Sequence, residues 1–428
     1  MFLGNDTLEI KDKVVHIDGY NVIELAEKFG TPLYVMSEEQ IKINAERYFK
    51  AFKDYKKDFI LAYAYKANSN LAITRLLTKL GCGADVVSGG ELYIAKLSKV
   101  DNDKIVFNGN CKTKEEIVMG VESEIRAFNV DSISELIMIN ETAKELGKVA
   151  NVAFRVNPDI NPKTHPKIST GLKKSKFGLP LDLAKKAIKM ALEMENVNFV
   201  GIHCHIGSQI TDVSPFIEET RKMMEFIVEL KNEGIEVRDL NLGGGLGVPY
   251  YKDKEIPTVE DYAKAIINTI YEFEDKVEIP NLILEPGRSI VATAGYLITK
   301  VHHIKETSCK WVMVDAGMND MLRPAMYEAY HHIINAKVKG EKEVVSVAGG
   351  LCESSDIFGK DRELDKVEVG DTIIIFDVGA YGISMANNYN ARGRPRMILT
   401  SKKGVYIIRE RETYADLISK DLIPPHLL

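Results

Sequence analysis

The chain has 428 residues, of which 45% are hydrophobic, and a formal net charge of −6 with both signs scattered along it. This length exceeds that of one typical domain, and the scattered charge argues against a protein that binds nucleic acid or a membrane surface. Five unclustered cysteines, a charged N-terminal segment and the lack of a membrane-length apolar run predict a cytoplasmic protein.

The first strand-like segment, LEIKDKVVHIDG (8–19), precedes a regular alternation of short apolar runs and amphipathic segments. Segments such as 134–147 and 214–234 have apolar residues at three- and four-residue spacing, which predicts helices. The apolar runs between such segments are rich in β-branched residues and predict eight strands: 61–66, 83–88, 104–109, 125–130, 151–157, 199–207, 237–245 and 281–287.

Eight strand–helix units in succession predict a (β/α)8 barrel, which we place at residues 36–287. The alternative is a doubly wound open sheet, although such a sheet usually has five or six parallel strands.

After residue 288 the pattern changes to strands that are separated mainly by turns. The short helical piece RPAMYEAYHH (323–332) is an exception. The predicted strands are 310–317, 343–350, 371–379, 395–401 and 404–410. This pattern predicts a second, mostly antiparallel β domain. The N-terminal strand is expected to join it, so that this domain comprises residues 1–35 and 288–428.

Reactive or flexible groups follow the predicted barrel strands, and barrel active sites form at the carboxyl ends of their strands. These groups are Lys66, Asp85, Ser88, Asn108, Asn157, His203, His205, Gly243–Gly245 and Glu285–Arg288. Each has a plain explanation by itself, because a lysine after a strand is commonly solvated and glycine triplets are common in turns. The two histidines share one strand face, as metal ligands can. No further ligand lies nearby in the sequence, so we expect no metal.

Taken together, these groups suit a phosphorylated aldehyde cofactor. The glycines after the seventh strand allow backbone N–H groups to approach an anion, and Arg288 adds a planar cation. Lys66 can bind an aldehyde, Glu285 can keep a pyridine nitrogen protonated, and His205 can stack on a flat ring. The sequence therefore predicts pyridoxal 5′-phosphate as the cofactor.

Six motifs in this order, YAYKAN, HCHIGSQ, GGGLG, EPGR, GGLCESSD and GAYG, resemble those of the fold-type III pyridoxal-phosphate decarboxylases, over nearly the whole chain. These enzymes pair an alanine-racemase-like barrel with a β domain. The resemblance implies that Lys66 binds the cofactor covalently as an imine, His205 stacks on its ring and Glu285 pairs with its pyridine nitrogen. It further implies a cofactor site completed by Asp85, Ser208, Gly244, Gly245, Gly287, Arg288 and Tyr381.

The same resemblance implies roles in the second domain. Cys352 would return a proton after carbon dioxide leaves, and Glu353 would hold a distal amine of the substrate. In this family both come from the partner subunit, which implies a homodimer. Arg323 and Tyr327, spaced to share a helix face, would bind a substrate carboxylate. The plainer alternatives are a buried hydrophobic role for Cys352 and an exposed helix face for Arg323 and Tyr327.

The substrate expected from these residues is an amino acid with both an ammonium and a carboxylate at its far end. A distal carboxylate requires a cation, best an arginine, and the candidates for substrate binding are Arg288, Arg323, Tyr327, Glu353 and Tyr381. The segment HPKISTGLKKSKFG (165–178) also resembles such enzymes and predicts a loop near the barrel rim. The alternatives are a sister decarboxylase for a basic amino acid or carboxynorspermidine, and a catalytically silent cofactor carrier.

Overall fold

The computed structural model describes residues 2–160 and 176–427. The chain divides into two compact units. The first, which we call the sheet unit, comprises Met1–Ile41, Pro249–Glu255 and Val291–Leu428. The second, the barrel unit, comprises Lys42–Val248 and Ile256–Ile290.

The barrel unit contains eight parallel strands that close into a barrel, in the order β10-β11-β12-β5-β6-β7-β8-β9. Nearly all their residues are buried, as expected for strands covered by helices on one side and by the packed barrel interior on the other. The predicted barrel is confirmed, and the open-sheet alternative is wrong. The strands are β5 (Phe59–Ala64), β6 (Gly83–Val86), β7 (Ile105–Phe107), β8 (Ala127–Val130), β9 (Ala150–Arg155), β10 (Val197–His203), β11 (Asp239–Asn241) and β12 (Asn281–Leu284).

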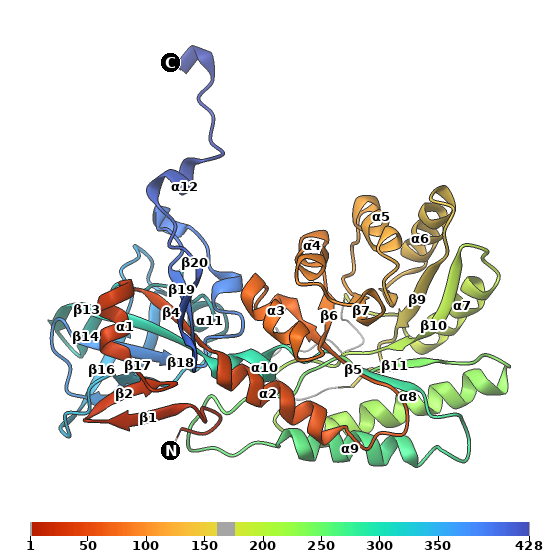
Figure 1. Ribbon diagram of the computed structural model, residues 1–428, viewed down its shortest axis with the longest axis horizontal. Coiled ribbons are helices and arrows are strands. Elements are labelled where there is room, and N and C mark those ends of the chain that lie inside the picture. Colours follow the sequence, from red (N-terminus) through yellow and green to blue (C-terminus); the bar gives the residue numbers. More distant parts are fainter. Residues whose placement is uncertain (1, 161–175, 428) are drawn as a thin grey trace. The chain divides into compact units, whose positions relative to one another are not determined.

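A helix follows each barrel strand, and these helices lie outside the strands (Figure 1). Two of them, α5 and α9, begin at threonine capping boxes, Thr113 with Glu116 and Thr258 with Asp261, which satisfy the first free backbone N–H groups. The helices are α2 (Glu38–Ala51), which precedes β5, α3 (Leu71–Lys79), α4 (Gly89–Leu97), α5 (Lys114–Glu122), α6 (Ile133–Glu145), α7 (Leu181–Leu192), α8 (Ser214–Asn232), α9 (Val259–Tyr271) and α10 (Arg288–Val291).

The sheet unit is built on a nine-stranded, mostly antiparallel sheet. Strand β4, from the N-terminal part of the chain, pairs antiparallel with β13 and parallel with β19, so the sheet joins both ends of the sequence. The strands are β4 (Leu33–Ser37), β13 (Gly295–Glu306), β14 (Lys310–Val314), β15 (Ile333–Asn335), β16 (Lys342–Ala348), β17 (Ile357–Asp365), β18 (Thr372–Phe376), β19 (Arg396–Ser401) and β20 (Gly404–Arg409). All five strands predicted after residue 288 are present.

Some features of the sheet unit differ from expectation. The segment 8–19 forms β1 (Leu8–Lys11) and β2 (Val14–Ile17), which build a separate three-stranded sheet with β3 (Tyr20–Asn21). It lies in the sheet unit, but it does not extend the large sheet. The strands β3, β4, β13, β15 and β17 were not predicted. The helix predicted at 323–332 is α11 (Arg323–Tyr327) only, because Glu328 has a φ of 53° and leaves the right-handed helix.

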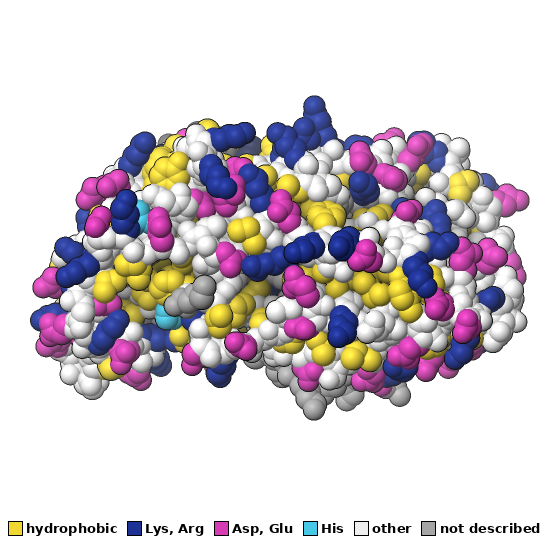
Figure 2. Space-filling view, turned by 60° about the horizontal axis from the view of Figure 1, so that its bottom comes forward, with side chains coloured by type: hydrophobic (Ala, Val, Ile, Leu, Met, Phe, Trp, Pro, Cys, Tyr) yellow, Lys and Arg dark blue, Asp and Glu magenta, His cyan; other side chains and the backbone are white. Residues whose placement is uncertain are grey.

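Two further helices belong to the sheet unit, α1 (Val22–Phe29) and α12 (Tyr414–Ile418). In the residues that the structure describes, no helix is long and apolar enough to cross a membrane. Figure 2 shows lysine and arginine side chains interspersed with aspartate and glutamate on the face in view, in accord with the mixed charge of the sequence.

Candidate active site

Lys66 lies just beyond the end of strand β5, in the short 3-10 turn Tyr65–Ala67. Its neighbours Tyr65 and Ala67 are buried, whereas the Lys66 side chain is 41% exposed. Its Nζ lies 3.8 Å from Oδ2 of Asp85, which follows on the next strand, β6, and is fully buried. The barrel therefore presents an accessible amine directly above a buried carboxylate.

Glu285 follows strand β12 and accepts hydrogen bonds from side chains of four other strand ends. Its Oε1 accepts from Nδ2 of Asn241 at 2.7 Å, of Asn108 at 2.8 Å and of Asn129 at 3.4 Å. Its Oε2 lies 3.2 Å from Nε2 of His203. The second hydrogen of the Asn108 amide is donated to Asp85 Oδ1 at 2.7 Å, so one asparagine bridges the two carboxylates.

The two buried carboxyl groups differ in their proton affinity. Burial and the charge of Glu285 raise the pKa of Asp85 to about 7, against the opposing effects of Lys66 and Asn108. Burial also acts to raise the pKa of Glu285, but His203, Lys66 and Asn108 outweigh it and hold this pKa below its ordinary value. Glu285 is therefore the ionised member of the pair, as a partner of a protonated pyridine nitrogen must be.

His205 presents a neutral imidazole at the same rim. Burial, Lys66 and Arg155 hold the pKa of His205 well below its ordinary value. Its Nδ1 accepts the backbone N–H of Gly244 at 3.2 Å, which leaves the proton on Nε2 and ties the ring to the glycine loop. A neutral, oriented ring is what stacking on a flat cofactor requires.

The glycine loop after strand β11 cannot carry side chains. Gly243 and Gly245 have φ angles of 62° and 121°, which favour glycine. A Cβ on Gly244 would collide with the Glu285 carbonyl oxygen, and one on Gly245 would lie 2.7 Å from the Gly207 oxygen. Gly287 is equally tight, since a Cβ there would lie 2.9 Å from that of Ala67. Bare backbone at these positions lets N–H groups approach a phosphate.

Arg288 opens helix α10 beside this loop and supplies a positive charge. Its guanidinium is buried and donates from Nε and Nη2 to Oγ of Ser208, at 3.2 and 3.0 Å. The rim also holds polar atoms for which the chain supplies no hydrogen-bond partner, Oδ2 of Asp85 and Nδ1 of His203. An anion cradle, an amine and buried polar atoms fit a phosphorylated pyridine aldehyde.

The remaining predicted residues lie in the sheet unit. Arg323 is the first residue of α11 and is buried, so an exposed helix face does not describe it. Its Nη1 donates to Oη of Tyr250 at 2.8 Å and to Nε2 of His331 at 2.7 Å. Tyr327 is half-buried, and Tyr381 has a φ of 58°, a backbone strain of the kind that collects at functional sites.

Cys352 and Glu353 are both exposed in the single chain, so the interpretation of Cys352 as a buried hydrophobic residue is wrong. Their loop is nevertheless firmly held. The buried Asp356 carboxylate accepts the N–H groups of Leu351 at 2.8 Å and Met318 at 2.6 Å. The Cys352 N–H is donated to Oδ1 of Asn390 at 2.8 Å.

The structure thus brings nine of the predicted residues to one rim of the barrel unit: Lys66, Asp85, His205, Ser208, Gly244, Gly245, Glu285, Gly287 and Arg288. Sequence reasoning missed Asn129 and Asn241, which lie inside short strands and carry no motif. Of the predicted loop 165–178, residues 165–175 lie outside the described residues. No group of three or more potential metal ligands occurs among the described residues.

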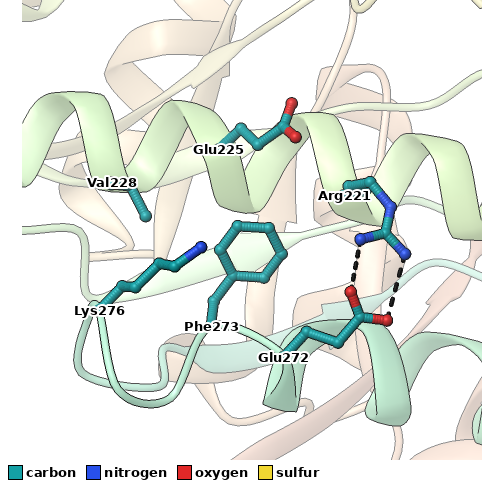
Figure 3. A pocket seen from close by; sticks show the side chains of 6 residues that line it. All are labelled: Arg221, Glu225, Val228, Glu272, Phe273 and Lys276. Carbon is teal, nitrogen blue, oxygen red and sulfur yellow. Dashed lines mark hydrogen bonds and ion pairs between the residues drawn. The ribbon is translucent and has the colours of Figure 1, made fainter.

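A separate surface pocket lies between helix α8 and the segment that follows α9 (Figure 3). Arg221 and Glu272 pair across it, with Nη2 and Oε1 3.1 Å apart, and the Phe273 ring forms its apolar floor. The Arg221–Glu272 ion pair thus links helix α8 to the segment that follows α9.

Comparison with known proteins gives consistent results. The family model described as the pyridoxal-binding domain of pyridoxal-dependent decarboxylases matches residues 21–292. Diaminopimelate decarboxylase of Methanocaldococcus jannaschii is 79% identical, over 100% of this chain and 99% of that protein. The enzyme of the same name from Archaeoglobus fulgidus is 47% identical, over 97% and 99%.

Solved structures agree with this. The crystal structure of diaminopimelate decarboxylase from M. jannaschii in complex with L-lysine has a TM-score of 0.97 and covers 100% of both chains at 79% identity. That of the Helicobacter pylori enzyme with L-lysine has a TM-score of 0.89 at 40% identity, covering 93% of this chain and 98% of that one. The chain belongs to the family of pyridoxal-dependent decarboxylases.

Proposed function

We infer that this protein decarboxylates meso-2,6-diaminopimelate to L-lysine and carbon dioxide with pyridoxal 5′-phosphate, the last step of lysine biosynthesis. The observation that carries this conclusion is the 79% identity, over the whole chain, to a diaminopimelate decarboxylase whose crystal structure contains L-lysine, the product of that reaction.

The cofactor, when bound, supplies an electron sink for the charge left on carbon as carbon dioxide departs. Lys66 is the residue that would attach it, with its amine accessible beside Asp85. The phosphate would be held by the glycine loop, Ser208 and Arg288, and by Tyr381. Glu285 would pair with the ring nitrogen, and the neutral His205 ring would lie on the ring face.

The substrate would be bound at its far end by residues of the sheet unit. Arg323 suits a carboxylate because its guanidinium is buried and is held through Nη1 by hydrogen bonds to Tyr250 and His331. Tyr327, Tyr381 and Arg288 would complete this carboxylate site, and Glu353 would accept the distal ammonium. Cys352, an exposed thiol, would return the proton to carbon.

We also propose that the active form is a homodimer in which Cys352 and Glu353 serve the partner's site. The support is that both side chains are exposed in a single chain although their loop is held by Asp356 and Asn390. We further propose that the barrel and β regions act as two domains, 36–287 and 1–35 with 288–428.

The decisive experiment measures carbon dioxide release by the purified holoenzyme from meso-diaminopimelate, lysine, ornithine, arginine and carboxynorspermidine. We expect the rate of release from diaminopimelate to be at least 100-fold above the rates from the other compounds. A site built to pair a carboxylate penalises substrates that lack one by several kcal/mol. Preferred release from another compound would identify a sister decarboxylase. No release from any compound, with cofactor bound, would indicate a silent cofactor carrier.

A further inference from the structure

Glu285 differs from Glu219, another buried carboxyl group of the barrel unit. Glu219 on α8 is also buried, has the Cys204 thiol 3.0 Å from its Oε1, and its pKa is raised by burial to about 8. Glu285 is 7% exposed, yet its pKa lies below the ordinary value. Burial alone would therefore have produced a protonated acid, and the difference between the two residues lies in their neighbours.

Three asparagine amides distinguish the surroundings of Glu285. They come from the ends of β7, β8 and β11, and all three donate to the same oxygen, Oε1, at 2.8, 3.4 and 2.7 Å. An amide N–H stabilises a carboxylate but gains little from its protonated form, because a protonated oxygen is a poor acceptor. The set therefore favours the ionised state. It also occupies Oε1, so that the capacity to accept another hydrogen bond remains on Oε2.

The orientation of these amides is itself determined by hydrogen bonds. Oδ1 of Asn108 accepts from Nδ2 of Asn129 at 2.9 Å, and Oδ1 of Asn241 accepts the Gly243 N–H at 2.9 Å. Turning either amide would place two oxygens against each other or leave the Gly243 donor unpaired, at a cost typical of a buried unsatisfied group. The nitrogens of Asn108 and Asn241 are thus held toward Glu285.

We propose that Asn108, Asn129 and Asn241 are positioning residues that keep Glu285 ionised, so that the proton shared between Glu285 and the cofactor's ring nitrogen stays on the nitrogen. This inference rests on the proposed pairing of Glu285 with that nitrogen. The proton resides on whichever of the two groups is more basic, and the three amides would act with His203 and Lys66 to make Glu285 the less basic one. The electron sink of the cofactor depends on a protonated ring.

Several titratable groups also act on Glu285 or respond to it: Lys66, Asp85, His203, Cys204, His205 and Tyr262. His203 and Lys66 lower the pKa of Glu285 together with Asn108. Burial lowers the pKa of His203 itself, so its charge is lost at a lower pH than that of an exposed histidine. Asparagines do not titrate. Their effect persists at every pH at which the fold is intact, whereas the charge of His203 is lost as the pH rises.

The test replaces Asn129 with leucine, which keeps the volume and removes both amide hydrogen bonds. The holoenzyme is reconstituted with pyridoxal phosphate labelled with 15N in the ring, and the nitrogen signal is followed by NMR from pH 6 to 9. We expect the signal to move from the protonated toward the unprotonated position over the pH range in which the pair holds one proton, because a more basic Glu285 takes that proton from the ring nitrogen. We expect kcat to fall about tenfold, because the chemical step needs the ring proton, with KM within about twofold.

Asn241→Leu provides a second variant with the same expected direction, in case Asn129→Leu does not fold. The matched control is Asn281→Leu, at the other end of β12, which removes an amide hydrogen bond of 3.0 Å to the buried Asp239 carboxylate. It should leave the 15N titration unchanged. If neither asparagine variant shifts the titration although Glu285→Gln does, the inference is wrong and the proposed pairing stands. If Glu285→Gln also has no effect, the pairing itself is wrong.

Discussion

The surroundings of Asp85 change its ionisation. It is fully buried, and burial together with the charge of Glu285 raises its pKa to about 7. An unfolded aspartate releases its proton near pH 4. Between pH 4 and 7 the folded protein therefore keeps a proton that the unfolded chain has lost, and the free energy of unfolding falls as the pH rises through this window.

Replacing Asp85 with asparagine removes this dependence, because the amide keeps the shape and never ionises. For the cofactor-free protein, we compare the unfolding free energy of Asp85→Asn with that of wild type at each pH. We expect this difference to be about 2 kcal/mol more favourable to the variant at pH 8 than at pH 5. Urea unfolding at both values measures it. Asp421→Asn on the exposed chain end is the control and should change both free energies equally. If Asp85→Asn changed the unfolding free energy by the same amount at pH 5 and at pH 8, the Asp85 carboxyl of the wild-type protein would ionise normally in the fold.

The residues that could be predicted are those that contrast with their neighbours. Lys66, His205 and Glu285 interrupt or end apolar runs, and that contrast is visible in the sequence alone. Asn129 lies inside AFNV and Asn241 inside DLN, where an asparagine is simply one more strand residue. Their importance arises from hydrogen bonds to Glu285, 156 and 44 positions away, and a single sequence contains no signal for such pairings.

Among the elements, helix α11 and the loop after it act as one support for Arg323. The guanidinium lies over the Tyr250 ring, 4.7 Å from its centroid, and donates to His331 Nε2 at 2.7 Å. His331 in turn has Nδ1 2.7 Å from the Phe376 carbonyl oxygen, at the end of β18. That carbonyl can only accept, so Nδ1 carries the proton and Nε2 is the acceptor for Arg323. The His331 imidazole is thereby neutral and held in one orientation, in which it accepts a hydrogen bond from Arg323.

The His331→Phe substitution keeps a ring but removes the acceptor. If Arg323 binds the distal carboxylate as proposed, KM for diaminopimelate should rise about tenfold with kcat changed little, since a hydrogen bond to a charged group is lost. The affinity for cadaverine, which has no carboxylate, should stay the same. His331→Gln, which restores an acceptor, should recover part of the loss. If the steady-state kinetics of His331→Phe were unchanged, the hydrogen bond between His331 and Arg323 would have no role in substrate binding.

The elements that could be predicted are the barrel strands, because each is a continuous apolar run buried on both sides. Strand β13 escaped prediction because its second half, toward Glu306, is largely exposed and polar. Strand β17, IFGKDRELD, carries five charged residues at the edge of the sheet and has no apolar run. Helix α11 was expected to be longer, because a glutamate such as Glu328 does not indicate the left-handed conformation that ends the helix.

At the scale of the whole molecule, the catalytic role proposed for Cys352 depends on a second subunit. The loop is anchored through Asp356 and Asn390, yet it presents Cys352 and Glu353 to the outside of the single chain. An anchored loop with exposed functional groups suits an interface in which each subunit completes the other's site. Light scattering should accordingly give twice the mass of 47.9 kDa.

A complementation experiment tests the shared site directly. Lys66→Ala and Cys352→Ala chains, each expected to be nearly inactive, are co-expressed with different tags and allowed to pair. If Cys352 serves the partner, a mixed dimer has one site that lacks both residues and one site that is intact. Since half of randomly paired dimers are mixed, we expect about a quarter of wild-type activity to return.

If Cys352 instead serves its own chain, both sites of the mixed dimer are defective and no activity returns. Mixing Lys66→Ala with Lys66→Arg is the matched control, because no arrangement of these two chains contains an intact Lys66. Purification on both tags in sequence isolates the mixed dimer, whose activity should then approach half that of wild type. An inactive doubly tagged dimer would show that the two sites are not shared, and would leave the cofactor site at the barrel rim unaffected.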